Sequence, residues 1–282
     1  MAVNPIHKNI NFRKILKEVS GIAGLLWEKN WAESNAGNIS YRLENDLKHI
    51  SDKFITDEIK LKKSYKNLAG KSVVITCAGS RMRDIKKMPQ NYLCLLSFSS
   101  KGKSYKIIKL SDLKLYPTSE LSPHLEIHNT LTKINPEFKS VLHTHPSEII
   151  AVSNIKKFNN EIALNNLLKS LHPEISFAFP EGIGLIKYIL SGSKKLSEVT
   201  AKKFIKYNFC VWEKHGCISA GKTLADAFDK VDVIVKSLKI FFLCRDAGYN
   251  FEGLNKNQIK ELDNYISKGY LKKFLKSNIS EK

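Results

Sequence analysis

The chain has 282 residues, of which 43% are hydrophobic and 10% aromatic, and this composition excludes an intrinsically disordered protein. No segment approaches the ~18 consecutive apolar residues of a membrane span, so we expect no membrane partner. The net charge of +19 comes from lysines scattered along the whole chain. Because no basic stripe is interleaved with aromatic residues, this charge predicts a solvated basic surface and no nucleic-acid partner.

The cysteines and the N-terminus indicate a cellular compartment. Five cysteines show no C-x-x-C spacing and lie mostly inside apolar runs, which favours reduced core cysteines over disulfides. The N-terminal sequence MAVNPIHKNINF has no apolar core followed by small residues, as a secretory signal would. We therefore expect a cytoplasmic protein.

The first half of the chain predicts one helix and a meander of strands. Apolar residues between positions 12 and 27 recur every three or four residues, as on one face of a helix. A break follows at residues 35–38, and the lysine-rich stretch 51–70 is expected to form a loop or insertion. Alternating or apolar runs predict strands at residues 39–43, 72–76, 92–98 and 105–110.

The second half mixes helices with strands. A helix is predicted over residues 122–134, with Ser122 as its N-cap and Pro123 at its first position. Further helices are expected at residues 147–153, 159–170, 196–208 and 224–243, and strands at residues 140–144, 175–179, 209–213 and 217–220.

The order of these elements predicts the fold class. Helices and strands alternate rather than segregate, and no repeat or Pro/Gly-rich linker divides them. We predict one α/β domain over residues 1–282, an α/β/α layered fold around a mostly antiparallel central sheet. The lysine-bearing tail, residues 277–282, is expected to be frayed.

The segment His143-Thr144-His145 is the most informative local pattern. On a strand, residues i and i+2 point to the same side, so two imidazoles could bind one metal ion. A catalytic zinc site usually takes three protein ligands, and His215, in a turn after a predicted strand, is a candidate for the third. Packing or hydrogen bonding of these histidines at a strand end is the alternative. The other five histidines have no such pairing, and we expect them to be structural.

Glu120 lies just before the predicted helix at 122–134. It is either an exposed carboxylate near a helix N-terminus or a general base beside a cation, and the sequence leaves both open. The segments 35–38 and 78–80 place small residues between elements. Their backbone N–H groups could face a phosphate, although plain turns are the alternative.

Several segments, taken in this order, resemble the class II aldolase/epimerase/adducin-head family. They cover the chain from about residue 12 to residue 250 and are WAESNAGNIS (31–40), CAGSRMRD (77–84), PTSELSPHLEIHN (117–129), VLHTHP (141–146), FPEGIG (179–184) and VWEKHGCISA (211–220). The order of these motifs is far more specific than any one of them.

The resemblance implies a role for each candidate residue. It implies that His143, His145 and His215 bind one Zn²⁺ per subunit. It also implies that Glu120 and Glu174 are the catalytic carboxylates. By the same analogy, the substrate phosphate would be bound near Asn35, Gly37, Asn38, Gly79, Thr118 and Ser119. Ala78 departs from relatives that have a serine before the glycine, which weakens this part of the analogy.

The resemblance further implies a phosphorylated ketose as substrate and a homotetramer. Segments 117–124 and 179–216 are most similar to the branch that cleaves L-rhamnulose 1-phosphate into dihydroxyacetone phosphate and L-lactaldehyde. The alternatives are a sister enzyme, namely a fuculose-phosphate aldolase, a ribulose-phosphate 4-epimerase or a methylthioribulose-phosphate dehydratase, and a non-catalytic scaffold like the adducin head.

Overall fold

The computed structural model of the protein describes residues 10–44, 54–113 and 115–269, and within these ranges it contains one nine-stranded sheet. The order across the sheet is β2-β5-β4-β3-β1-β6-β9-β8-β7, and only the β7–β8 pair is parallel. The strands are β1 (Asn38–Leu43), β2 (Ile59–Lys60), β3 (Ser72–Thr76), β4 (Leu93–Phe98), β5 (Ser104–Ile108), β6 (Ser140–Thr144), β7 (Gly184–Ile186), β8 (Phe209–Trp212) and β9 (Gly216–Gly221).

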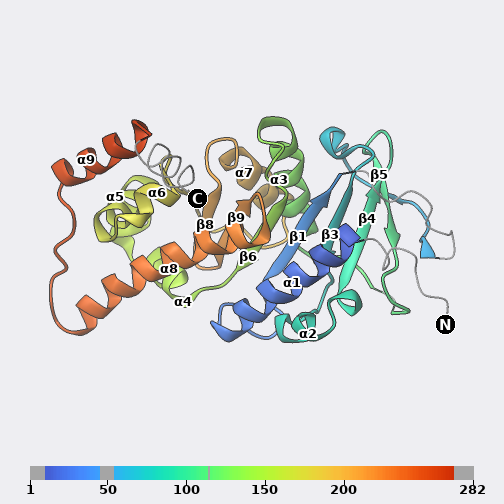
Figure 1. Ribbon diagram of the computed structural model, residues 1–282, viewed down its shortest axis with the longest axis horizontal. Helices are drawn as coiled ribbons and strands as arrows, with labels where there is room; N and C mark the ends of the chain where they lie inside the picture. The colour runs from blue at the N-terminus through green and yellow to red at the C-terminus, as the bar shows by residue number, and fades with distance from the viewer. Residues whose placement is uncertain (1–9, 45–53, 114, 270–282) are drawn as a thin grey trace, which may run out of the picture.

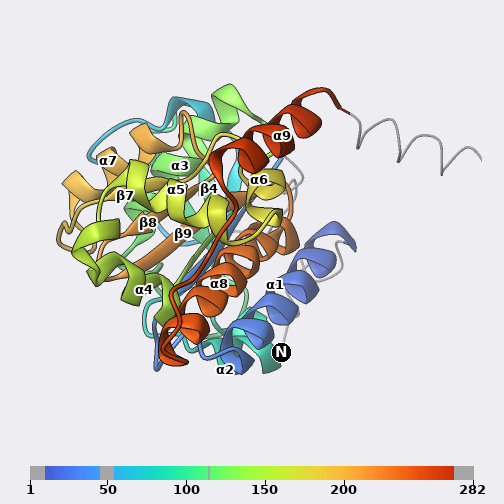
Figure 2. The same ribbon diagram turned by 90° about the vertical axis from the view of Figure 1, so that its left-hand side faces the viewer.

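Helices cover both faces of this sheet. Figure 2 shows α1 and α8 on one side and α3 and α7 on the other, and Figure 1 shows α8 crossing near β6 and β9. The α-helices are α1 (Ile10–Glu28), α2 (Met82–Lys87), α3 (Leu121–Ile134), α4 (Ser147–Asn154), α5 (Glu161–Leu171), α6 (Glu174–Ala178), α7 (Lys194–Lys203), α8 (Leu224–Asp246) and α9 (Lys256–Ser267).

The layering follows from the side-chain alternation of the strands. Successive residues of a strand point to opposite faces. In β6, Leu142 packs with the cluster that contains α1 and α8, whereas Val141 packs with residues of α3 and α7. Both faces are apolar, so every residue of β6 is buried, including His143 and Thr144. The prediction of a layered α/β fold with a mostly antiparallel sheet is confirmed.

Most predicted elements are present with shifts of a few residues at their ends, but two details were wrong. Residues 175–179 were expected to form a strand, whereas α6 occupies Glu174–Ala178. Five residues with three apolar side chains fit either structure, and here the turn after Pro173 and packing against α8 favour the helix.

The start of α3 was the second error. The N-cap is Glu120 rather than Ser122, and the helix begins at Leu121. A turn precedes it, in which Leu121 N–H donates to the Thr118 carbonyl and Glu120 N–H donates to Thr118 Oγ1. The Glu120 carboxylate makes no cap hydrogen bond to α3. It is therefore available to groups outside the helix.

Three short elements, α2, β2 and β7, and the longer helix α9 were not predicted. Strand β2 lies within the lysine-rich stretch 51–70, which was expected to form a loop or insertion. The tail 277–282 and residues 51–53 lie outside the described residues. All five cysteines are free, and four of them are buried. In the part of the chain that the structure describes, no helix is long and apolar enough to cross a membrane.

Core packing of β6 can be tested by truncating Leu142, which is fully buried. We expect Leu142→Ala to lower the free energy of unfolding by ~2–5 kcal/mol, because a buried cavity adds to the lost hydrophobic transfer. Leu243 on α8 is 67% exposed, so Leu243→Ala should change it by no more than ~0.5 kcal/mol. Urea titration of both variants measures the free energies of unfolding. An equal decrease in the two variants would contradict the placement of Leu142 in the core and of Leu243 at the surface.

Candidate metal centre and active site

His143 and His145 leave the end of β6 on the same side of the strand. β6 is paired with β1 on one side and β9 on the other, and this fixes the position of its last residues. The Trp31 carbonyl accepts hydrogen bonds from the His145 N–H (2.7 Å) and from the Thr144 hydroxyl (2.6 Å). The turn that follows α1 therefore holds the chain at His145.

His215 comes from the tight turn that joins β8 to β9. Its N–H donates to the Trp212 carbonyl at 3.0 Å, and Lys214 adopts a positive φ of 60° in this turn. A Cβ atom at Gly216 would lie 2.4 Å from the Thr144 carbonyl oxygen. Only glycine allows this approach of the hairpin to the end of β6, so Gly216 brings His215 next to the other two histidines.

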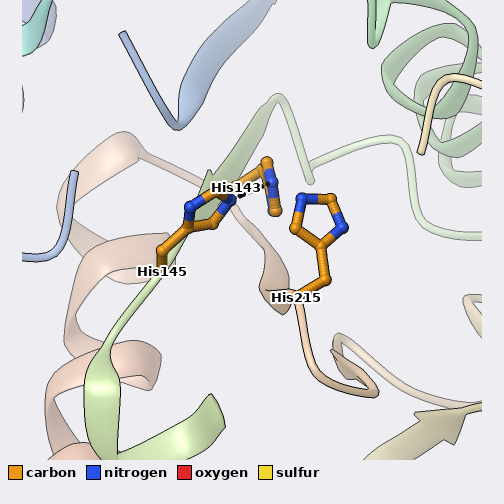
Figure 3. A group of neighbouring side chains, drawn as sticks. All are labelled: His143, His145 and His215. Atoms are coloured by element: carbon orange, nitrogen blue, oxygen red, sulfur yellow. Dashed lines mark hydrogen bonds between the residues drawn. The ribbon is translucent and has the colours of Figure 1, made fainter. Parts of the chain in front are cut away.

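The three imidazoles face one another, as Figure 3 shows. One ligand nitrogen from each of His143, His145 and His215 lies within 4.8 Å of the others. The Nε2 atoms of His143 and His145 are 3.0 Å apart, and the ring centroids of the three pairs lie 4.8–4.9 Å apart. The sequence-predicted ligands are thus brought together from two separate stretches of the chain.

The hydrogen bonds behind the rings fix their tautomers. His143 Nδ1 donates to the Cys217 carbonyl at 2.8 Å, and His145 Nδ1 donates to the Glu33 carboxylate at 2.9 Å. Neither acceptor can donate a proton, so Nδ1 carries the hydrogen in each ring. The two Nε2 atoms that face each other at 3.0 Å are then held together by a proton or by a metal ion that both can bind. The arrangement therefore fits a divalent metal ion, for which hydrogen-bonded neutral imidazoles are usual ligands.

Burial favours the neutral, metal-binding form of His143 and His215. His143 is fully buried, and burial lowers its pKa to about 3 despite the nearby Glu120. Burial also lowers the pKa of His215. For Glu33, burial would raise the pKa, but the hydrogen bond to His145, a backbone hydrogen bond and attraction to His145 and His215 together lower it. Neutral ring nitrogens and an ionised outer carboxylate favour cation binding.

Glu120 lies beside the three histidines. Its carboxylate oxygens are 3.3 Å from His143 Nε2 and 3.9 Å from His215 Nε2. Ser191 Oγ donates to Oε1 at 2.6 Å, and Asn38 Nδ2 donates to Oε2 at 2.9 Å. Burial would raise the pKa of Glu120, but attraction to His143 and these two hydrogen bonds lower it to about 2. An ionised carboxylate next to a metal site can accept a proton from a bound ligand.

The segment 31–38 wraps around the histidines. Asn38 lies opposite His143 across the β1–β6 pair, and its amide is buried. Gly37 has a positive φ of 76°, and a Cβ atom there would be 3.0 Å from the His143 carbonyl oxygen. Gly37 thus permits close packing on β6. Asn35 is exposed in the same turn.

The second small-residue loop lies against the start of α3. Cys77 pairs with Pro117 across an isolated bridge, and Thr118 N–H donates to the Thr76 carbonyl. Gly79, with a positive φ of 73°, and Ser119 are exposed next to this bridge. Thr118 Oγ1 lies 3.4 Å from Asn38 Nδ2, which connects this loop to the first one. Thr118 and Asn38, two of the predicted phosphate residues, are therefore direct neighbours of Glu120.

Glu174 is placed differently from the other predicted site residues. It is exposed at the first position of α6. Among the residues that the structure describes, no hydrogen bond or ion pair joins it to the histidines or to Glu120. The arrangement of a single chain therefore does not bring the two predicted catalytic carboxylates together.

Three residues of the site were not predicted from the sequence. Glu33 orients His145, Ser191 holds Glu120, and Trp212 packs against both His143 (ring centroids 4.6 Å apart) and His215 (5.3 Å). Glu33 and Trp212 lie inside the motifs at 31–40 and 211–220, so those motifs carried a signal for them. Ser191 lies in a segment, SGSKK, that resembles an ordinary helix start, and nothing in the sequence connects it to Glu120.

Comparison with known proteins defines the class. The Class II Aldolase and Adducin N-terminal domain family matches residues 17–242. The chain is 34% identical over 261 residues to a rhamnulose-1-phosphate aldolase of Bacteroides thetaiotaomicron, covering 88% of this chain and 93% of that protein. It is 31% identical over 229 residues to a rhamnulose-1-phosphate aldolase of Listeria welshimeri, with 80% and 82% covered.

A solved structure of an aldolase is also similar to this chain. The sugar-phosphate aldolase from Thermotoga maritima superposes with a TM-score of 0.74 at 31% identity, covering 86% of this chain and 99% of that one. The fold and the histidine triad define a metal-dependent aldolase of the class II type. The chain belongs to the class II aldolase and adducin N-terminal domain family.

Metal binding by the triad can be measured directly. We expect the purified protein to hold one divalent ion per chain, and His145→Ala to lower the metal content several-fold because three ligands become two. His172, at the C-cap of α5, is the matched control, and His172→Ala should keep the metal. Elemental analysis of both variants gives the stoichiometry. Full metal content in His145→Ala would mean that the ion binds elsewhere.

Proposed function

We propose that this protein is a zinc-dependent aldolase that reversibly cleaves L-rhamnulose 1-phosphate to dihydroxyacetone phosphate and L-lactaldehyde. The observation that carries the proposal is the convergence of three imidazoles, whose ligand atoms lie within 4.8 Å of one another, beside the Glu120 carboxylate. The choice of substrate rests on the relatives at 34% and 31% identity that are named rhamnulose-1-phosphate aldolases. Three imidazoles with one open position are the ligand set typical of catalytic zinc.

In this proposal His143, His145 and His215 hold the ion, which when bound supplies Lewis-acid polarisation of the substrate ketone. Glu120 then acts as base and acid. In synthesis, the Glu120 carboxylate removes a proton from the carbon that attacks the aldehyde. In cleavage, Glu120 first takes up a proton from solvent and then gives it to the carbon from which the aldehyde departs, while the hydroxyl proton is released through a second base. The carboxylate can do this because Ser191 and Asn38 hold it beside the ligand nitrogens while its side chain, 8% exposed, stays largely away from water.

The phosphate of the substrate is proposed to bind where the two small-residue loops meet. Gly79 and Ser119 are exposed there, and Thr118 and Asn35 lie on the adjoining turns. Gly37 and Asn38 frame this site from the β1 side. Exposed backbone N–H groups in such loops favour an anion.

Glu174 remains our proposal for the base that takes the hydroxyl proton during cleavage. Because it makes no described contact with the metal-binding residues, the role needs either a movement of α6 or a neighbouring subunit. We also propose a homotetramer and a cytoplasmic location. The free state of all five cysteines supports the location, since such a compartment keeps thiols reduced.

The substrate can be tested on a panel of ketose phosphates. We expect the highest kcat/KM with L-rhamnulose 1-phosphate and lower values with L-fuculose 1-phosphate and L-ribulose 5-phosphate. Unphosphorylated L-rhamnulose should bind poorly, because the phosphate contacts are lost. Coupled detection of dihydroxyacetone phosphate measures each rate. Preference for another member of the panel would reassign the substrate within the family.

The role of Glu120 can be separated from metal binding. We expect Glu120→Gln to keep the metal content of the wild type and to lower kcat by roughly 10²–10⁴-fold, since an amide cannot transfer the proton. Glu174→Gln, measured in parallel, tests the second carboxylate. Loss of metal in Glu120→Gln would instead assign Glu120 to ion binding.

A further inference from the structure

A line of buried polar side chains runs from Glu120 into the interior between β1 and α3. His124 Nε2 lies 2.5 Å from Asn38 Oδ1, and His124 Nδ1 lies 2.6 Å from Ser40 Oγ. His128, one turn further along α3, has its Nε2 2.8 Å from the same hydroxyl. His124 and His128 are fully buried, and Asn38 and Ser40 are at most 5% exposed. Buried polar groups of this number need a consistent pattern of donors and acceptors.

The contact between Asn38 and Glu120 sets the direction of these hydrogen bonds. Asn38 Nδ2 donates to Glu120 Oε2 at 2.9 Å, so the NH₂ group of Asn38 faces Glu120. Asn38 Oδ1 then faces His124 and accepts from His124 Nε2–H. Since His124 is neutral, its Nδ1 carries the lone pair and accepts from the Ser40 hydroxyl.

The remaining bond agrees with this direction. The Ser40 oxygen accepts from His128 Nε2–H, which leaves a lone pair on His128 Nδ1. That atom has no hydrogen-bond partner among the described residues. A partnerless lone pair costs less than a partnerless N–H. Burial also lowers the pKa of His124 to about 4 and that of His128 well below its usual value, which keeps both rings neutral.

The same pattern leaves Asn38 with a single favourable orientation. A flipped amide would bring Oδ1 to 2.9 Å from the Glu120 carboxylate and turn NH₂ toward His124 Nε2–H. The first contact would then pair two acceptors, and the second would pair two donors. His124 is the group that makes the flipped state unfavourable on the side away from Glu120.

We infer that His124 is a positioning residue: its Nε2–H fixes the Asn38 amide with the NH₂ group toward Glu120 and so holds the proposed acid/base beside the histidine triad. The inference rests on the function proposed for Glu120. It goes beyond that function in assigning the side-chain amide of Asn38 to the base, in addition to the place of Asn38 beside the proposed phosphate site. It also gives the buried His124 a part in the reaction.

Three variants on one helix test this inference. His124→Leu removes the donor to Asn38. His124→Gln restores a donor, because the glutamine Nε2 is separated from Cα by the same number of bonds as the histidine Nε2. His128→Leu is the matched control, since His128 is equally buried on α3 but, among the described residues, has no hydrogen bond to Asn38 or Glu120.

We expect His124→Leu to lower kcat by roughly 10- to 100-fold, the usual effect of removing an outer hydrogen-bond partner, while KM and metal content stay near wild type. His124→Gln should recover most of the lost kcat. His128→Leu should stay within about threefold of wild-type kcat even if its melting temperature falls as far as that of His124→Leu. Rates are compared at a temperature at which all variants are folded.

Equal kcat losses in His124→Leu and His128→Leu, or no recovery in His124→Gln, would overturn the inference. If the wild type cleaves no ketose phosphate, the proposed function fails instead. A readout without turnover then still tests the hydrogen bonds. In protein labelled with ¹⁵N-histidine, the resonances lost in His124→Leu should show the Nε2–H tautomer, and an Nδ1–H tautomer would refute the assigned direction.

Discussion

The antiparallel pairing of β6 with β1 on one side and β9 on the other is the constraint on which the whole site depends. The β1 pairing sets Asn38 opposite His143, and the β9 pairing brings the Cys217 carbonyl to His143 Nδ1. A slip of one residue in either register would turn His143 and His145 to the opposite face of the sheet. The buried, two-sided apolar pattern of β6 opposes such a slip, so core packing and metal geometry depend on the same strand.

The electrostatics of the site follow from where each partner is buried. Burial lowers the pKa of His143, and the pKa of Glu120 is lowered because attraction to His143 and two hydrogen-bond donors outweigh the effect of its burial. The exposed Glu33 accepts a hydrogen bond from His145 Nδ1 and so orients this imidazole from the solvent side. The site therefore combines three imidazoles with a buried carboxylate close by.

The buried line behind Asn38 extends the site into the core. Its members are polar groups that would be costly in an apolar interior, yet each bond along it has a donor and an acceptor. This arrangement connects the orientation of one carboxylate to the packing of α3 against β1. Stability of the interior and geometry of the reactive group are thus two consequences of the same contacts.

The sequence by itself determined the layered α/β class, most helices and strands, and the three histidines with Glu120, because residue types and the order of motifs carry that information locally. It failed at α6, where five residues suit either structure, and at Ser191. Only the tertiary structure decided the hydrogen bonds that tune the site: partners such as Glu33 and His145 are 112 residues apart, and Asn38 and Glu120 are 82 apart. Contacts at such separations arise from strand order and hairpin geometry, which no local pattern encodes.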